Sequence, residues 1–124
     1  MFELSKQFRF DAAHTLDRSI DAASSRRIHG HSYRAEVTVR GRPDPATGMI
    51  VDLGLLERSL EEAREALDHR FLDEINDLGP ATLENLSRWI WDRLKPAVPG
   101  LSKVSVHRDS AGETCSYWED GAAS

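Results

Sequence analysis

Hydrophobic and polar residues alternate in two stretches of the N-terminal third of the chain. In the range 2–10, Phe or Leu occupies every even position except position 6. In the range 33–40, Tyr, Ala and Val alternate with Arg, Glu and Thr. A period of two residues is typical of a strand that buries one face. We therefore predict two strands here, and an antiparallel pair is the simplest arrangement.

The middle of the chain has a helical period instead. Apolar residues between Leu53 and Leu67 recur at intervals of three and four, and Asp52 stands before them as a candidate N-cap. A second stretch begins after Gly79-Pro80, with Thr82 as its candidate cap, and prolines follow it. The sequence thus predicts two helices, of which the second buries its tryptophan side chains in the core.

The C-terminal part predicts two more short strands. The apolar positions 104–106 and 115–117 flank the range 109–112, whose residues are typical of a tight turn. The range 15–28 has few apolar residues and is expected to be an irregular loop. The order ββααββ predicts a single α+β domain over residues 1–124, a four-stranded antiparallel sheet with two helices on one face. Open sheet edges in so small a chain favour self-association.

The composition narrows the class of protein and its partners. With 124 residues and 40% hydrophobic residues, the chain is long enough for one core. It has no apolar run that could span a membrane, no apolar signal-peptide core and a single cysteine, which predicts a cytoplasmic protein. The net charge of -5 argues against general binding to nucleic acid. Arg26 and Arg27 could still bind a polyanionic small molecule.

Three of the five histidines have a spacing that suits a metal site. His29 and His31 are two residues apart, so in a strand both imidazoles leave the same face, and His14 precedes them. Three neutral imidazoles around Zn²⁺ leave a fourth position for water or substrate, which is typical of a reactive zinc site. A structural site built from cysteine pairs is excluded because Cys115 stands alone. The pattern predicts a catalytic Zn²⁺ site.

Five short motifs occur in order along the chain. They are Phe10-Asp11-Ala12-Ala13-His14, Ile28-His29-Gly30-His31-Ser32-Tyr33, Gly48-Met49-Ile50-Val51-Asp52, Leu67-Asp68-His69-Arg70-Phe71-Leu72 and Pro80-Ala81-Thr82-Leu83-Glu84-Asn85. Together they resemble the zinc-dependent pterin synthases of the tunnelling fold, the 6-pyruvoyl-tetrahydropterin synthase and 6-carboxytetrahydropterin synthase family. The resemblance spans nearly the whole chain. Its specificity lies in the order of the motifs, because each motif alone is a weak indication.

The resemblance implies roles for several residues. His14, His29 and His31 would bind Zn²⁺, and Asp68 would orient His69 for proton transfer. Histidine titrates near neutrality and a neighbouring carboxylate can fix its tautomer, which suits a general acid–base group. The family assembles as hexamers of two stacked trimers with substrate sites between subunits, so the resemblance also implies a homohexamer.

The chain departs from the family pattern at two places. Family members commonly carry a cysteine four residues before the His-Gly-His tripeptide, as base or nucleophile, and this chain has Ser25 there. The family also places a Glu-Thr pair near the C-terminus, whose carboxylate binds the pterin. Counting forward from the preceding strand puts Arg108 at the position of the family glutamate, whereas counting back from the following strand puts Asp109 there. Glu113 matches the family glutamate in residue type but not in position. Arg108 could not accept the pterin's donors, so Asp109 or Glu113 is the candidate, with Asp109 slightly favoured.

We predict from this resemblance a zinc-dependent 6-carboxytetrahydropterin synthase. It would convert dihydroneopterin triphosphate to 6-carboxytetrahydropterin, acetaldehyde and triphosphate, on the way to queuosine and other deazapurines. Arg27 and Thr82 are further candidates for substrate binding, and Ser25 is a candidate substitute for the missing cysteine. The alternatives are a 6-pyruvoyl-tetrahydropterin synthase or a relative that cleaves the side chain. In another functional class, the chain would be a paralogue that binds zinc and a pterin without turnover.

Overall fold

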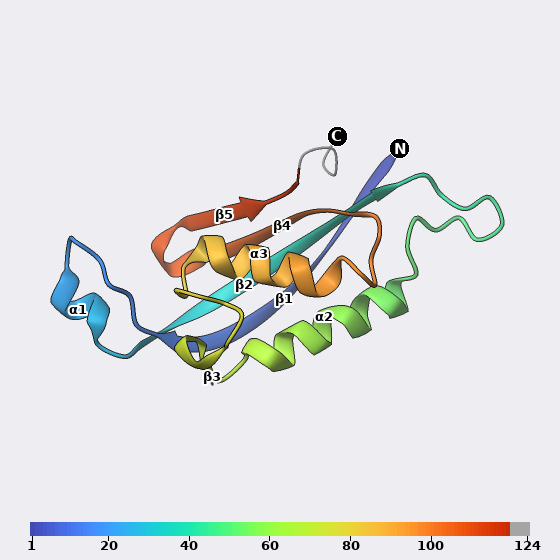
Figure 1. Cartoon of the computed structure of the whole chain (residues 1–124). Coiled ribbons are helices and arrows are strands. Elements are labelled where there is room, and N and C mark those ends of the chain that lie inside the picture. The colour runs from blue at the N-terminus through green and yellow to red at the C-terminus, as the bar shows by residue number, and fades with distance from the viewer. Residues whose placement is uncertain (120–124) are drawn as a thin grey trace.

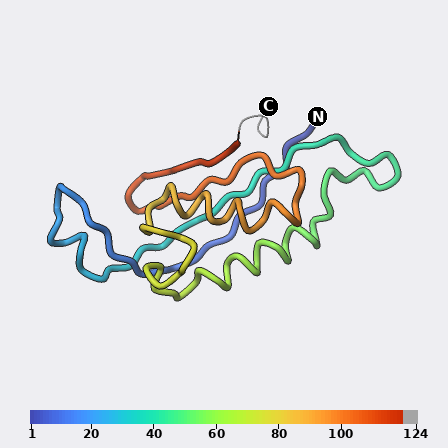
Figure 2. Tube along the Cα trace, in the orientation of Figure 1, coloured from blue at the N-terminus to red at the C-terminus, as the bar shows by residue number. Residues whose placement is uncertain are grey.

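The computed structural model describes residues 1–119, and their strands form one sheet in the order β3-β1-β2-β4-β5. The elements in chain order are β1 (Phe2–His14), α1 (Ala22–Arg26), β2 (His29–Gly41), α2 (Leu53–Leu67), β3 (Arg70–Phe71), η1 (Leu72–Glu74), α3 (Leu83–Leu94), β4 (Leu101–Arg108), η2 (Asp109–Ala111) and β5 (Glu113–Tyr117). Helices α2 and α3 lie against the same face of the sheet (Figure 1). Two connections, residues 15–28 and 42–52, project from opposite ends (Figure 2). The last five residues of the predicted domain lie outside the described part.

Strands β1 and β2 form a long antiparallel pair, as predicted. Their pairing extends over both whole strands and ends with His14 opposite His29. The predicted alternation is confirmed, because the apolar side chains in the range 33–39 are at most 2% exposed. On this buried face Phe10 stacks on Tyr33 with ring centroids 4.9 Å apart. Both strands continue beyond the predicted ranges, so the ends of the pair carry histidines on a rigid element.

Both predicted helices form, and their caps are those that the sequence indicates. The Asp52 carboxylate accepts hydrogen bonds from the N–H groups of Gly54 and Leu55, and the Thr82 hydroxyl accepts one from Asn85. Such caps satisfy N–H groups that have no partner within the helix. Helix α2 packs on β1 and α3 on β4 and β5, and the tryptophans of α3 are at most 5% exposed. None of the helices among residues 1–119 is long and apolar enough to cross a membrane.

The sheet has five strands rather than the predicted four, and it is not wholly antiparallel. The additional strand, β3, is two residues long and pairs parallel to Ala12 and Ala13 of β1. After α2 the chain reverses at His69, whose φ of 58° lies in the left-handed region, and this brings the next residues beside β1. Two residues are too few for an alternating pattern, so hydrophobic periodicity could not reveal this strand.

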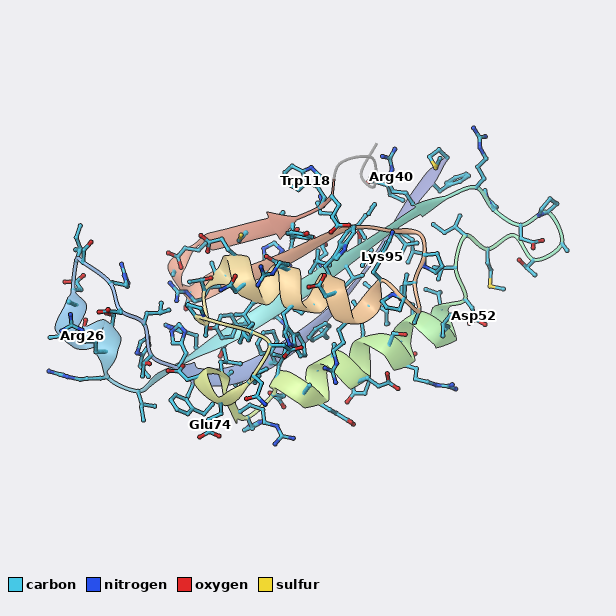
Figure 3. All side chains as sticks on the ribbon, in the orientation of Figure 1. Arg26, Arg40, Asp52, Glu74, Lys95 and Trp118 are labelled. Carbon is cyan, nitrogen blue, oxygen red and sulfur yellow. The ribbon has the colours of Figure 1, made fainter. Side chains whose placement is uncertain are left out.

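The predicted order ββααββ is also wrong, because a third α-helix lies in the range predicted as an irregular loop. Helix α1 has one buried residue, Ser25, and so lacks the apolar stripe by which a helix is recognised in a sequence. Its N-cap, Asp21, has a left-handed backbone with φ of 56°. The Leu16 N–H donates to the Ser25 carbonyl at 2.8 Å, which ties the loop to the helix. Helix α1, with Arg26 on it, projects from the end of the sheet (Figure 3).

Candidate functional site

The three histidines predicted to bind a metal come together where β1 ends and β2 begins. His14 is the last residue of β1, and His29 and His31 are the first and third residues of β2. His14 Nε2 lies 2.9 Å from His29 Nε2 and 3.1 Å from His31 Nε2. His14 has an even number, like the buried residues of β1, and His29 and His31 have odd numbers, like the buried apolar residues of β2. All three therefore project onto the face that the helices cover. We call these three residues the histidine cluster.

The backbone fixes which ring nitrogen is free in two of these residues. His14 Nδ1 lies 2.8 Å from the carbonyl of Ala81, just before α3, and His29 Nδ1 lies 2.7 Å from the carbonyl of Arg27. A carbonyl only accepts, so each Nδ1 carries the proton and donates it. The neutral rings then turn two bare Nε2 lone pairs toward each other across 2.9 Å. Two such acceptors repel unless a cation lies between them.

The cluster favours a metal ion over a proton. Burial is the largest cause that lowers the pKa of His14, and burial followed by Arg108 lowers the pKa of His31 to about 4. Neutral imidazole is the form that binds a metal. With Zn–N bonds of about 2.0–2.1 Å in a tetrahedral site, ligand nitrogens would be about 3.3 Å apart. The observed spacings of 2.9 and 3.1 Å are close to that, so the donor set fits a divalent metal.

A cavity of about 550 Å³ opens beside the histidine cluster, between α1, the start of α3 and the β4–β5 hairpin. Besides the histidines, its polar lining includes Ser25, Tyr33, Thr82, Glu84, Arg108 and Glu113. Three of the predicted site residues, Ser25, Thr82 and Glu113, therefore share this cavity with the cluster. Arg27 does not line it, and contributes its carbonyl to His29 instead.

Ser25, predicted as a candidate substitute for a cysteine, is buried and lines this cavity. Its hydroxyl donates to the Ala22 carbonyl at 3.0 Å and accepts from the Arg18 N–H at 3.4 Å. Neither partner is a base that could activate a serine as a nucleophile. The hydroxyl is used to hold the α1 turn.

The two carboxylates that the sequence left open take different places at the β4–β5 hairpin. Arg108 and Glu113 are opposite each other in the ladder and share the parity of the buried valines of β4, so both face the cavity. Asp109 comes after the strand, and its carboxylate accepts two hydrogen bonds of 3.1 Å from Arg34, a residue of opposite parity. Glu113, rather than Asp109, is therefore the carboxylate beside the histidine cluster, and Arg108 donates to it.

Arg108 and Tyr33 are among the side chains of the cavity that are absent from the predicted site. Arg108 Nη1 lies 3.1 Å from His31 Nε2, and the buried Tyr33 hydroxyl has no acceptor for its proton among the described residues. Burial raises the pKa of Tyr33 to about 12, although the charge of the adjacent Arg108 and a hydrogen bond from it oppose that rise. Strand alternation contained the missing signal, since Tyr33 follows His31 by two residues and so shares its face.

The predicted proton-transfer pair lies just after α2. Asp68 Oδ1 accepts from the Asp11 N–H at 2.9 Å, and Asp68 Oδ2 accepts from Arg64 at 3.1 Å and from His69 Nδ1 at 2.9 Å. The hydrogen bond from Asp11 is the largest cause that lowers the pKa of Asp68 and keeps the carboxylate ionised. The His69 side chain is 81% exposed, so its Nε2 is left to solvent or to a ligand.

The Asp68–His69 pair and the histidine cluster open onto different cavities. His69 lines a second cavity of about 500 Å³ together with Asp11 and Ser32. These strand residues have the parity opposite to the cluster, so this cavity lies toward the face that α2 and α3 leave open. Only His31 borders both cavities among the residues that the structure describes. One chain therefore does not place His69 in the cavity of the histidine cluster.

Known proteins resemble this chain in sequence and in fold. The family model described as 6-pyruvoyl tetrahydropterin synthase matches residues 3–120. The 6-carboxy-5,6,7,8-tetrahydropterin synthase of Synechocystis sp. is 36% identical over 112 residues, which cover 86% of this chain and 85% of that one. The 6-pyruvoyl tetrahydrobiopterin synthase of Poecilia reticulata is 45% identical over 76 residues, 57% of this chain and about half, 51%, of that relative. The structure of Caenorhabditis elegans 6-pyruvoyl tetrahydropterin synthase has a TM-score of 0.81 at 26% identity and covers 95% of both chains.

Proposed function

Because the chain belongs to the 6-pyruvoyl tetrahydropterin synthase family, we propose that it is a zinc-dependent lyase acting on a reduced pterin triphosphate. The observation that carries this proposal is the convergence of three imidazoles, with Nε2 atoms 2.9 and 3.1 Å apart, beside a cavity. His14, His29 and His31 would hold the zinc. The cavity of about 550 Å³ is of a size that small-molecule sites have.

The proposed reaction removes protons from carbon atoms that carry hydroxyl groups. When bound, zinc would supply an electrophile that acidifies these positions and stabilises negative charge on their oxygens. His69 would take up and return the protons through Nε2, because histidine titrates near neutral pH. Asp68 would orient the ring by accepting a hydrogen bond from Nδ1.

Two copies of the chain would contribute to one reaction centre. His69 borders the cavity on the open face, whereas the histidine cluster lines the cavity on the covered face. A second copy that docks its His69 cavity against the cluster of the first would join the two halves. This arrangement supports the homo-oligomer implied by the resemblance, with substrate sites between subunits, and we propose a homohexamer of two trimers.

The proposed product is 6-carboxytetrahydropterin, made from dihydroneopterin triphosphate with release of acetaldehyde and triphosphate in queuosine and deazapurine synthesis. The Synechocystis relative, aligned over 85% of its length, favours this activity. The second candidate is 6-pyruvoyl-tetrahydropterin synthase activity, which is favoured by the Pongo abelii 6-pyruvoyl tetrahydrobiopterin synthase, 34% identical over 121 residues. A cytoplasmic location is part of the same proposal, since a lone cysteine suits a reducing compartment.

The test is to incubate the purified, zinc-loaded protein with dihydroneopterin triphosphate and to identify the pterin products by mass spectrometry. We expect 6-carboxytetrahydropterin, and 6-pyruvoyl-tetrahydropterin would select the second candidate. The matched control is His29→Ala, which should bind zinc weakly and consume no substrate. Zinc and pterin binding without consumption would identify a binding paralogue, a reading that Ser25 in place of the cysteine favours. Failure to bind the pterin at all would overturn both readings.

A further inference from the structure

The cavity beside the histidine cluster contains hydrogen-bond donors that have no partner among residues 1–119. Tyr33 is 2% exposed and lines the cavity, and its buried hydroxyl lies beside Arg108, which can only donate, so the O–H has no acceptor among the described residues. Arg108 also lines the cavity, and its Nε is buried and unpartnered. Buried polar groups are nearly always paired in folded proteins, so two unpaired groups in one cavity point to a missing acceptor.

The two Nη nitrogens of Arg108 show which residues hold the guanidinium and for which lone pair it competes with a bound metal. Its Nη2 donates to Glu113, which faces it across the β4–β5 ladder. Its Nη1 lies 3.1 Å from His31 Nε2 and uses the lone pair of that nitrogen. A metal ligated by the histidine cluster would need the same lone pair, and one lone pair cannot serve both. Once the metal is bound, Nη1 loses its acceptor while Glu113 still holds the guanidinium in place.

We propose that Arg108 and Tyr33 form a subsite for an anionic oxygen of the substrate beside the metal position. The ligand class follows from the donors, because a planar guanidinium and a phenol both offer N–H or O–H groups to a carboxylate or an ionised hydroxyl. Asp21 and Glu84 also line the cavity, but among residues 1–119 no hydrogen bond joins either one to Arg108. The inference rests on the proposed metal site and names the group that this site recognises.

The first readout is the affinity of the cobalt(II)-loaded protein for acetate, a simple carboxylate. Acetate binding is measured from the change in the visible absorption of the bound cobalt(II). Arg108→Gln should weaken acetate binding by about tenfold to a hundredfold, because it removes charge-assisted hydrogen bonds. Tyr33→Phe removes only the hydroxyl and should weaken it by about threefold to tenfold. Arg34→Gln is the matched control, since Arg34 also pairs with a carboxylate of the hairpin but on the other face. It should leave acetate affinity unchanged.

The second readout is the affinity for cobalt(II) itself, which should change in the opposite direction. Arg108→Gln removes a cation and a competitor for His31 Nε2, so cobalt(II) should bind more tightly than in the wild type. A merely structural role of Arg108 would instead weaken both metal and acetate binding. If Arg108→Gln does not fold, Arg108→Lys keeps the charge and should give intermediate acetate affinity, and Tyr33→Phe remains as a second test.

Equal acetate affinity in the wild type, Arg108→Gln and Tyr33→Phe would overturn the subsite, and so would an equal loss in Arg34→Gln. Neither readout involves turnover of a pterin. The expected cobalt and acetate results without pterin consumption would therefore overturn the proposed function alone. Normal pterin turnover with unchanged acetate affinity would overturn this inference alone.

Discussion

Two inactive variants of this chain are expected to restore activity when they assemble together. His29→Ala removes a ligand from the histidine cluster, and His69→Asn removes the proposed proton-transfer group. Asn is the better replacement for His69 because the backbone φ of this residue is 58°, a left-handed conformation that Asn adopts more readily than most residues. Each variant alone should lose turnover by about a hundredfold or more, which is the usual contribution of a general acid–base group.

The size of the recovery follows from the two faces of the sheet. His69 and the histidine cluster open onto separate cavities of one chain, so under the proposed function a complete site would take its cluster from one copy and its Asp68–His69 pair from a neighbour. In an equal, random mixture each half is intact in one copy out of two. About a quarter of the sites then regain both halves, and the mixture should reach about a quarter of wild-type turnover per site.

The assay refolds equal amounts of the two variants together, verifies mixed assemblies by intact mass spectrometry and measures consumption of dihydroneopterin triphosphate. His69→Asn mixed with Asp68→Asn is the matched control, because both substitutions damage the same half of the site, and this mixture should stay at background. Background turnover in a verified assembly of His29→Ala with His69→Asn would refute the shared site. Turnover by a wild-type monomer would refute it as well.

Three further predictions concern single positions. Ser25→Ala should keep turnover within about threefold of the wild type, because the hydroxyl is bonded to a backbone carbonyl and an N–H rather than to a base; loss of turnover with normal zinc content would contradict this. Asp52→Ala should lower the free energy of unfolding by about 1 kcal/mol, the usual value of an N-cap, in urea denaturation at neutral pH. Asp52→Asn, which keeps an accepting oxygen, serves as its control. The hydrogen bond from the Asp11 N–H is the largest cause that lowers the pKa of Asp68 in the folded protein. The ionised carboxylate therefore contributes to stability at pH values above its ordinary pKa of 3.8, and this contribution is lost as the pH falls through the lowered pKa of the folded state. The difference in urea midpoint between the wild type and Asp68→Asn should therefore be larger at pH 7 than at pH 3, and a constant difference would count against the ionised, hydrogen-bonded carboxylate.

The parts of the fold that could be predicted are those whose signal is local and repeated. Alternation along the first two strands indicates which side chains are buried, and the caps at Asp52 and Thr82 mark where two helices begin. Strand β3 has no such signal, because it depends on a contact between residues distant in sequence. The His69 N–H donates to the Asp11 carbonyl at 2.7 Å, which joins the segment after α2 to β1. Helix α1 is missed for a related reason, since it buries a serine instead of an apolar stripe.

The histidine cluster could be predicted because strand alternation places His29 and His31 on one face, and the resemblance to the family adds His14. The pterin-binding carboxylate of the hairpin near the C-terminus could not be predicted. Counting from the two strands of the hairpin gives different residues for the position of the family glutamate. In the structure, residues 109–112 form the turn, and Arg108 and Glu113 face each other where the two strands meet it. The two residues therefore face the cavity together, while Asp109 turns to Arg34 on the other face. Since Arg108 donates to Glu113 and approaches His31, the hairpin presents a positive donor beside the cluster. A substrate group that contacts Arg108 there must accept hydrogen bonds, and this requirement separates the chemistry of this site from one in which a free carboxylate stands at the same position.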